Sequence, residues 1–279
     1  MNPQPSHRVH TCDSRRTSAQ GFTLTEMLVS MAIFLVICGS AFTLLAVSQQ
    51  RYQAESKTLN AFQEARLGLD QIMRDVSDAG YPPMNQFQVL PNPWQYAVSP
   101  FAWSPGYLTN SPCTLGPGGN PSCATPWDDG MFIETNPTPQ DPASTVQYIR
   151  YKMLSNPANT LGRGVFPKTG ADPYSTIPDS SLTPFVHNVM NDAPPSQIAQ
   201  INAIYPNMFP GGNPVPVFTY LCDSPTGPQL CTNPGVTGTP QNIRSVLITL
   251  IVAAPPDPQT GQPRVIELTG EATRMNSVP

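Results

Sequence analysis

The sequence predicts an α+β protein, with one long N-terminal helix followed by a domain of antiparallel β-strands and long proline-rich loops. The chain has 35 prolines in 279 residues, but none lies between Phe22 and Tyr81. Because proline lacks a backbone N–H and clashes with the preceding helical turn, it is excluded from helix interiors. The runs rich in β-branched and aromatic residues that indicate strands all lie after residue 129. The chain therefore divides into a helix-forming arm and a loop-rich body.

An uncharged segment of 21 residues runs from Met27 to Val47. That is about the length an α-helix needs to cross the hydrocarbon core of a membrane. A polar leader with three arginines, residues 1–21, precedes it, and one carboxylate, Glu26, borders it. We therefore expect residues 22–80 to form one long helix whose part 27–47 crosses the membrane.

The junction between the leader and the uncharged segment has a specific order of residues: Gly21, Phe22, Thr23, Leu24 and, two positions later, Glu26. This order resembles the N-terminal signal of the type IV prepilin family, which includes pilins and the pseudopilins of type II secretion. The resemblance implies cleavage between Gly21 and Phe22 by a prepilin peptidase, and N-methylation of Phe22. An ordinary secretory signal is cut after its hydrophobic segment, not before it.

The resemblance also implies a location and partners. The precursor would cross the inner membrane once, with the head domain, residues 81–279, in the periplasm. The mature subunit would then pack with other pilins or pseudopilins in a filament or at its tip on the cell surface. Thr25 replaces the usual aliphatic residue, and Thr43 stands where many major pilins carry a kinking proline. The second departure favours a minor subunit.

Glu26 is the candidate assembly residue. Insertion scales give a cost of roughly 2.5–3.5 kcal/mol for an acidic side chain at mid-membrane. The amine that cleavage creates on Phe22 is a suitable partner, but a short helical turn cannot easily fold that amine back onto the same chain's Glu26. We therefore expect an ion pair with the amine of a neighbouring subunit. The alternative is a carboxylate that only reaches to the membrane surface.

The predicted helix continues past the membrane edge. A stripe of apolar residues with helical spacing marks this part: Leu59, Phe62, Leu69, Ile72 and Val76. Gly80, which tolerates a left-handed backbone, and the prolines after it predict the end of the helix. The stripe either packs on the chain's own body or forms a coiled coil with a partner. The first is favoured because the body follows directly, and charged residues such as Asp75 are expected on other faces.

In the body, strands are predicted at 130–135, 145–154, 215–222, 243–253 and 264–269. The fourth is the most apolar, so we expect it in the middle of a sheet with 264–269 as its antiparallel partner. Residues 82–129 are predicted to form long loops, residues 155–180 turns, and residues 182–190 a short helix.

Two further segments resemble PilW-type minor pilins and the minor pseudopilin J of type II secretion. The first is carried by a set of residues near the end of the helix: Arg66, Leu69, Arg74, Asp75, Ala79 and Gly80. The second is the hairpin of 243–253 with 264–273. These resemblances imply a minor subunit, and the length of the chain favours a pilus subunit over a pseudopilin.

Four cysteines of the body form two local pairs. Outside the cytoplasm, local disulfides are the expected state, and they would join Cys113 to Cys123 and Cys222 to Cys231. The alternative is a zinc site with four thiolates. Its ligands usually come in tight pairs with two to four intervening residues, whereas these pairs are more widely spaced.

No enzyme signature is present. The sequence has no P-loop, no G-x-S-x-G and no H-E-x-x-H motif, and after the leader its single histidine is His187. The net charge of −4 gives no basic surface, so nucleic acid is not an expected partner. We expect a structural protein without cofactor or metal. The alternative from another class is a membrane-anchored periplasmic binding or adhesion module.

Two acidic groups are candidate metal or catalytic sites: Asp128 and Asp129 with Glu134, and Asp172 with Asp179. The favoured interpretation is that they are turn residues that accept hydrogen bonds from their own backbone. The alternative is a calcium site, but the sequence lacks an EF-hand-like run of alternating acidic residues.

If Glu26 sets subunit contacts through a neighbour's amine, Glu26→Ala will enter filaments about tenfold less efficiently, as expected for a loss of about 1.4 kcal/mol. The amount of the chain in sheared filaments, relative to the membrane, measures this. Thr25→Leu, which changes the adjacent residue to the common family type, is the control. Equal incorporation of Glu26→Ala and the wild type contradicts the pairing.

Overall fold

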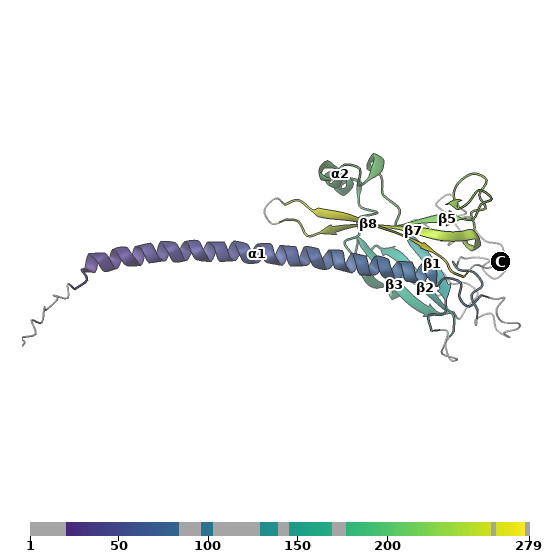
Figure 1. Ribbon diagram of the computed structural model, residues 1–279, viewed down its shortest axis with the longest axis horizontal. Helices are drawn as coiled ribbons and strands as arrows, with labels where there is room; N and C mark the ends of the chain where they lie inside the picture. Colours follow the sequence, from purple (N-terminus) through teal and green to yellow (C-terminus); the bar gives the residue numbers. More distant parts are fainter. Residues whose placement is uncertain are drawn as a thin grey trace, which may run out of the picture. The chain divides into compact units, whose positions relative to one another are not determined.

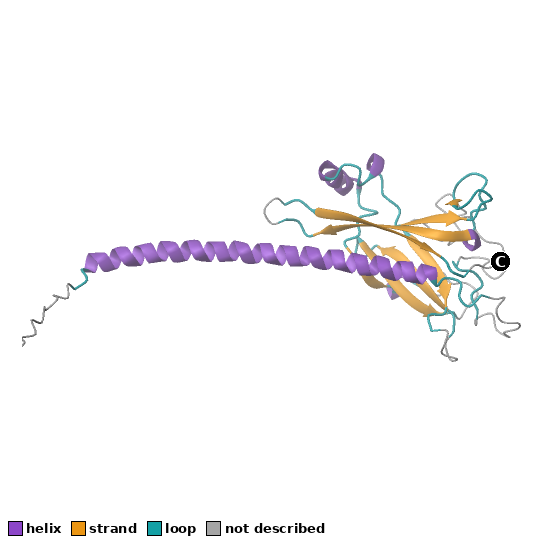
Figure 2. Cartoon of the chain, viewed as in Figure 1, coloured by secondary structure: helices purple, strands orange, loops and turns teal. Residues whose placement is uncertain are grey.

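The structure is a computed structural model that describes residues 21–83, 96–102, 129–138, 145–168, 177–257 and 261–276. These residues form two α-helices and two four-stranded antiparallel sheets (Figures 1 and 2). The chain has two compact units, residues 1–51 and 52–279. Helix α1 (Leu24–Ser77) begins in the first unit and ends in the second.

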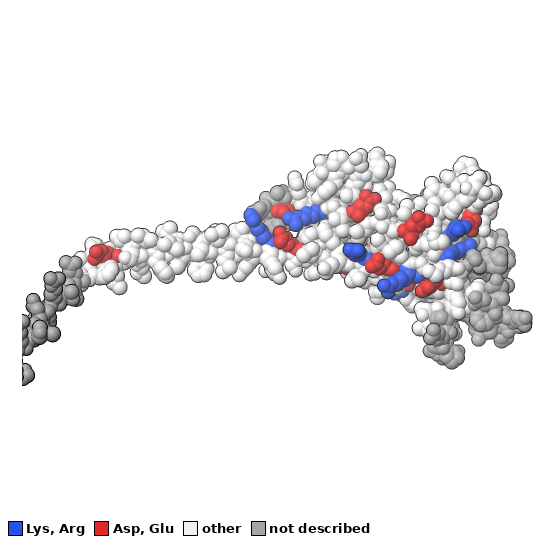
Figure 3. All heavy atoms as spheres, in the orientation of Figure 1, with Lys and Arg blue, Asp and Glu red and all other residues white. Residues whose placement is uncertain are grey.

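In the first unit, α1 exposes its large apolar side chains, among them Phe34, Val36 and Leu44. Figure 3 shows a long stretch of this helix with neither basic nor acidic atoms. By length and composition, α1 can cross a membrane. The predicted helix of residues 22–80 thus agrees with the structure to within three residues at each end.

In the second unit, one face of α1 is buried against the sheets. The buried apolar residues of this face are Ala65, Leu69, Ile72 and Val76. The predicted packing of the helix on the chain's own body is therefore confirmed from residue 65 onwards. It is wrong at Leu59, which is exposed. The chain leaves the helix through Gly80, whose φ of 81° is in the left-handed region, as the sequence predicted.

The first sheet has the strand order β1-β2-β3-β4. Its strands are β1 (Gly130–Thr135), β2 (Gln147–Leu154), β3 (Thr160–Pro167) and β4 (Thr183–His187). The predictions of β1 and β2 are confirmed. The prediction of turns throughout 155–180 is wrong because β3 lies there, and the predicted helix at 182–190 is wrong because β4 does.

The glycines of β3 explain the first error. Gly162 and Gly164 read as turn residues, but here they leave room for packing. A Cβ at Gly162 would lie 2.8 Å from the side chain of Leu154, and one at Gly164 would lie 2.4 Å from that of Phe166. The second error arises because β4 pairs with β3 at the sheet edge, where a proline such as Pro184 is tolerated.

The second sheet has the order β6-β5-β7-β8, with β5 (Phe218–Cys222), β6 (Gln229–Leu230), β7 (Ile243–Ala254) and β8 (Arg264–Thr273). The prediction that β7 is an inner strand with β8 as antiparallel partner is confirmed. The structure contains the expected disulfide between Cys222 and Cys231. Cys113 and Cys123 lie outside the described residues.

Helix α2 (Pro195–Ile204) was not predicted. It begins with a proline in its first turn, which is favourable there because the missing N–H would have no helical partner. Ile198 and Ile201 are buried and pack in a small cluster with Ile251 and Val265. A proline followed by apolar residues three apart was the available signal for this helix.

The outer half of α1 and both sheets share one core. Buried residues of α1, β1, β2, β5 and β7 belong to the same apolar cluster. The phenol of Tyr220 on β5 also donates a hydrogen bond of 3.0 Å to the carbonyl of Gly130 on β1. At Gly68, α1 approaches β4 so closely that a Cβ would lie 2.3 Å from Cγ2 of Val186. A residue without a side chain is required there.

We predict that Gly68→Ala destabilises the folded head by about 1–3 kcal/mol, the usual cost of overpacking. The loss occurs although alanine is the better helix former by about 1 kcal/mol. Urea unfolding of the full chain in detergent, followed by circular dichroism, measures it. Gly39→Ala is the matched control in the same helix, because a Cβ at Gly39 meets nothing within 4 Å. Equal unfolding midpoints for the two variants contradict the close approach.

Candidate assembly site

The first turn of α1 is closed by Thr23 and Glu26. The backbone N–H of Thr23 donates to Glu26 Oε2 at 3.0 Å, and the Thr23 hydroxyl donates to the same oxygen at 2.9 Å. In return, the backbone N–H of Glu26 donates to Thr23 Oγ1 at 3.4 Å. This is a capping box, in which an N-cap Thr and a Glu three residues later satisfy each other's backbone donors.

The capping box holds the Glu26 carboxylate at the positive end of the helix, where anions are stabilised. The side chain stays exposed and lines a surface hollow together with Phe22, Thr25, Val29 and Ser30. The structure thus brings together Phe22 and Glu26, the residues predicted from the sequence. It adds Thr23 as the cap, and the pattern Thr-x-x-Glu was the sequence signal for that role.

The segment that contains Phe22, Thr23 and Glu26 matches a protein-family model. Residues 16–42 match the prokaryotic N-terminal methylation motif. The chain carries a type IV prepilin-like N-terminus. The matched residues include Gly21, Phe22 and Glu26 and most of the uncharged segment. No curated protein and no solved structure matches the prepilin-like chain, so its head is not covered by any comparison.

The motif, which covers residues 16–42, is the one that type IV pilin-like and pseudopilin proteins carry, and it supports a protein of that kind. The α+β architecture, with one long N-terminal helix and an antiparallel domain, is pilin-like as well. Its apolar N-terminal helix is consistent with anchoring in a membrane.

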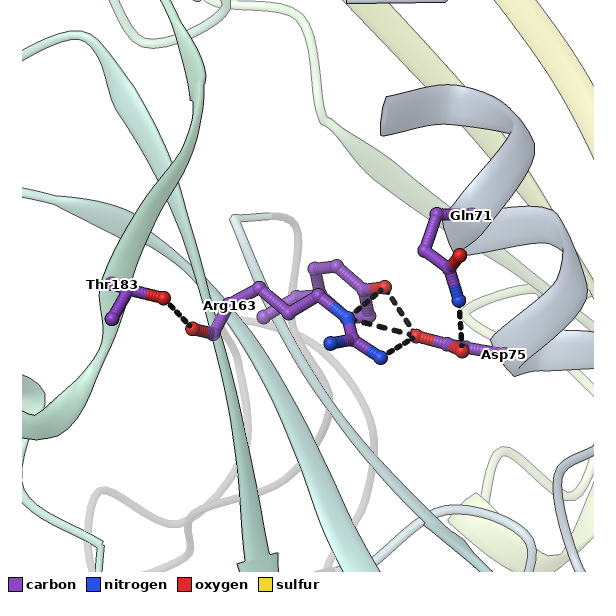
Figure 4. Close-up of polar contacts among 5 residues, drawn as sticks. Gln71, Asp75, Arg163 and Thr183 are labelled. Atoms are coloured by element: carbon purple, nitrogen blue, oxygen red, sulfur yellow. Dashed lines mark hydrogen bonds and ion pairs between the residues drawn. The ribbon is translucent and has the colours of Figure 1, made fainter. Parts of the chain in front are cut away.

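The prepilin-like helix is joined to the head by a buried carboxylate, Asp75 (Figure 4). Arg163 of β3 donates to Asp75 Oδ2 from Nη2 at 2.8 Å and from Nε at 3.0 Å. The phenol of Tyr151 on β2 donates to the same oxygen at 2.5 Å. Gln71, one turn earlier on α1, donates to Oδ1 at 2.8 Å. The expectation that Asp75 faces away from the packed stripe is therefore wrong.

Burial raises the pKa of the Tyr151 phenol well above its usual range, and the charge of Asp75 adds to this. The phenol therefore keeps its proton and remains a donor to the carboxylate. Strands β2 and β3 are thus both joined to α1 through the carboxylate of Asp75. It accepts hydrogen bonds from the charged Arg163 and from the neutral Tyr151. No sequence signal marked this cluster, because its members lie 76 and 88 positions apart.

A second carboxylate of the helix contacts β4. Oε1 of Glu64 accepts the backbone N–H of His187 at 2.9 Å and lies 2.6 Å from Nδ1 of the same residue. Both side chains are partly exposed, so this contact is weaker than the buried one. His187, which the sequence predicted to be a structural or surface residue, thus lies at the surface beside the helix.

In each of the two acidic groups considered as metal sites, one carboxylate forms an ion pair with a basic side chain of the chain. Glu134 is fully buried against Lys168 and accepts the backbone N–H groups of Val98 and Ser99. Burial lowers the pKa of the Lys168 amine, and the charge of Glu134 opposes this shift. Asp128 lies outside the described residues, and within them no cluster of metal-ligating side chains occurs.

Asp179 forms ion pairs with the first sheet. Its carboxylate contacts Arg150 at 2.5 Å and Lys152 at 2.6 Å, both on β2. Burial would raise the pKa of Asp179, but the contacts with Lys152 and Arg150 outweigh it and lower that pKa. Asp172 lies outside the described residues. Glu134 and Asp179 are therefore paired with basic side chains of the chain, and the interpretation of Glu134 as a turn residue is wrong because it lies within β1.

We predict that Asp75→Asn lowers the free energy of unfolding by about 2–3 kcal/mol, since hydrogen bonds to a charged partner are lost in a largely buried place. Urea unfolding of the full chain in detergent measures the change. Asp70→Asn, a change of the same kind on the surface of the same helix, is the matched control. An Asp75→Asn protein as stable as the Asp70→Asn protein contradicts a role of this carboxylate in joining helix and head.

Proposed function

We propose that this protein is a minor pilin, a structural subunit that takes part in priming, building or capping a type IV pilus. The observation that carries the proposal is the methylation motif of residues 16–42, which includes most of an exposed, uncharged helical segment. A helix surface of this kind requires either lipid or other apolar helices around it. A filament subunit has lipid around this helix while it is in the membrane, and it has similar helices around it after assembly.

In this proposal, residues 1–21 are a leader that a prepilin peptidase removes between Gly21 and Phe22, and Phe22 is then N-methylated. Residues 27–47 cross the inner membrane, and residues 81–279 form a periplasmic head. The match to the motif spans the proposed cleavage point. The peptidase and other pilins are therefore the proposed partners, and the filament or its tip is the final location.

Glu26 has two states in the proposed cycle. In the single chain its carboxylate closes the first helical turn by bonding to Thr23. In a filament it would accept the amine of a neighbouring subunit, which the exposed hollow around it leaves room to approach. Ionised partners strengthen such hydrogen bonds about twofold over neutral ones, and the pair would fix the axial position of one subunit against the next.

Two features favour a minor over a major subunit. The helix has Thr43 where many major pilins have proline, and the Thr43 hydroxyl donates to the carbonyl of Gly39 within a continuous helix. The segment Arg66–Gly80, which resembles PilW-type minor pilins, includes Asp75. Asp75 is also the carboxylate whose buried contacts with Tyr151 and Arg163 join the helix to the head.

The decisive experiment is the intact mass and N-terminal sequence of the protein isolated from its native membrane. We expect an N-terminus at Phe22 carrying one added methyl group, because the proposed cut between Gly21 and Phe22 lies before the apolar segment. An N-terminus at Met1 would replace the proposal with a simple membrane-anchored binding module. Cleavage beyond Val47 would mean a secreted soluble protein and would remove any role of Glu26 in assembly.

A further inference from the structure

Strand β8 is the outermost strand of the second sheet (Figure 1). The backbone N–H of Arg274, just after β8, donates to the carbonyl of Arg244 on β7, and the register of the two strands is uniform. In an antiparallel ladder, hydrogen-bonded and non-hydrogen-bonded pairs alternate. The odd-numbered residues of β8 therefore direct their backbone N–H and C=O groups away from β7: Val265, Glu267, Thr269, Glu271 and Thr273.

Neighbouring contacts agree with this assignment. The N–H of Met275, the next odd-numbered residue, donates away from β7 to the carbonyl of Ser77 at 3.1 Å. On β7, the N–H of Thr249 donates away from β8 to the carbonyl of Val217 at 2.9 Å. Between 265 and 273, in contrast, no residue that the structure describes pairs with the outward backbone groups. The outer edge of β8 is thus open up to the point where the end of α1 closes it.

The other outer strands of the two sheets are short or covered. Strand β6 has two residues and β4 has five, and the N–H of His187 in β4 already donates to Glu64. The outer side of β1 is covered, because Ala102 donates to the carbonyl of Phe132 there. A long open edge is a template for pairing with another strand. Among the described strands, β8 offers the longest row of free backbone donors and acceptors.

The two faces of β8 differ in chemistry. Ile266 and Leu268 face the main core and are only partly buried at its margin. On the other face, Glu267 and Glu271 are exposed, and neither forms an ion pair with a residue that the structure describes. Opposite charges at facing positions stabilise a pair of strands. The edge therefore favours a strand that has apolar residues on one face and basic residues on the other.

The same carboxylates disfavour a second copy of this chain as the occupant. In a symmetric antiparallel pair of two β8 strands centred on Thr269, Glu267 of each copy would lie opposite Glu271 of the other. Like charges that face each other directly destabilise a pair of strands. The charges of β8 thus discriminate between its own copy and a basic strand.

We propose that the open edge of β8, residues 265–273, binds an extended segment of a partner protein that alternates apolar and polar residues and places Lys or Arg opposite Glu267 and Glu271. Hydrogen bonds to the outward backbone groups give affinity in this mode of binding, and the side chains give specificity. At about 3.4 Å per residue, the edge is roughly 30 Å long. The inference does not rest on the proposed function, because it uses only contacts of the head.

The first test measures peptide binding to the full chain in a non-ionic detergent, by the fluorescence anisotropy of a labelled peptide. The probe is the peptide TVKVTVKVT, which reads the same in both directions and can therefore pair with β8 in either orientation. Its control is TVEVTVEVT. We expect the lysine peptide to bind about tenfold more tightly or better, because two facing pairs change from attractive to repulsive in the control. Equal binding of the two peptides contradicts the proposal.

Two variants locate the binding at the edge. Thr269→Pro removes an outward N–H, at an edge position where proline is tolerated, and should weaken binding of the lysine peptide about tenfold. Thr269→Ala keeps that N–H and should bind like the wild type. Glu267→Lys leaves the backbone unchanged and should reduce the preference for the lysine peptide about fivefold. Glu55→Lys, the same change at an exposed residue of α1, is its control and should not alter the preference.

The partner itself is sought in native cells with a photoreactive phenylalanine analogue at position 269, followed by mass spectrometry of the crosslinked peptide. We expect a segment of another protein that alternates apolar and basic residues. The absence of a crosslink, a crosslink to β8 of a second copy, or a crosslink to an acidic segment would each overturn the proposal. So would a Glu267→Lys protein whose peptide preference equals that of Glu55→Lys. None of these results bears on the cleavage at Phe22, so the proposed function stands or fails separately.

Discussion

Twenty-one consecutive residues without a charge set the main constraint on this molecule, because their helix cannot remain in water with its side chains exposed. The large apolar side chains of this segment are exposed. Their surroundings must be lipid or other proteins. Two features at the start of the helix are consistent with this constraint. The carboxylate lies at the border of the apolar segment, and the first turn is capped by the chain's own side chains.

The same helix has the opposite requirement in its last turns, where it forms part of the core of the head. Apolar packing there has little directional preference, so it does not by itself fix how far the helix is shifted along its axis against the sheets. Asp75 does, because its carboxylate receives donors from both β2 and β3. A shift of one turn would move it by about 5.4 Å and leave both donors without their acceptor. Gly68 adds a steric condition at β4.

The sequence was informative where one physical effect dominates. The long helix followed from the absence of proline, and the pairing of β7 with β8 from an apolar run next to a turn and a second strand. Prediction was wrong where tertiary contacts override local preference. The glycines of β3 serve close packing, and residues 183–187 extend because a neighbouring strand pairs with them. At the N-terminus, the spacing of Phe22 and Glu26 was readable, whereas the partners of Asp75 come from strands far along the chain and leave no local pattern.

The bonds between Thr23 and Glu26 have a consequence for how tightly proposed filament neighbours hold one another. A carboxylate that already accepts two hydrogen bonds within its own chain gives these up when it turns to another subunit's amine. The exchange replaces one set of contacts by another, so its net free energy is much smaller than the energy of either set alone. Glu26 would then determine the axial position of one subunit against the next more than it would contribute to the binding free energy between them. A filament built on such an exchange would owe most of its stability to contacts other than this one.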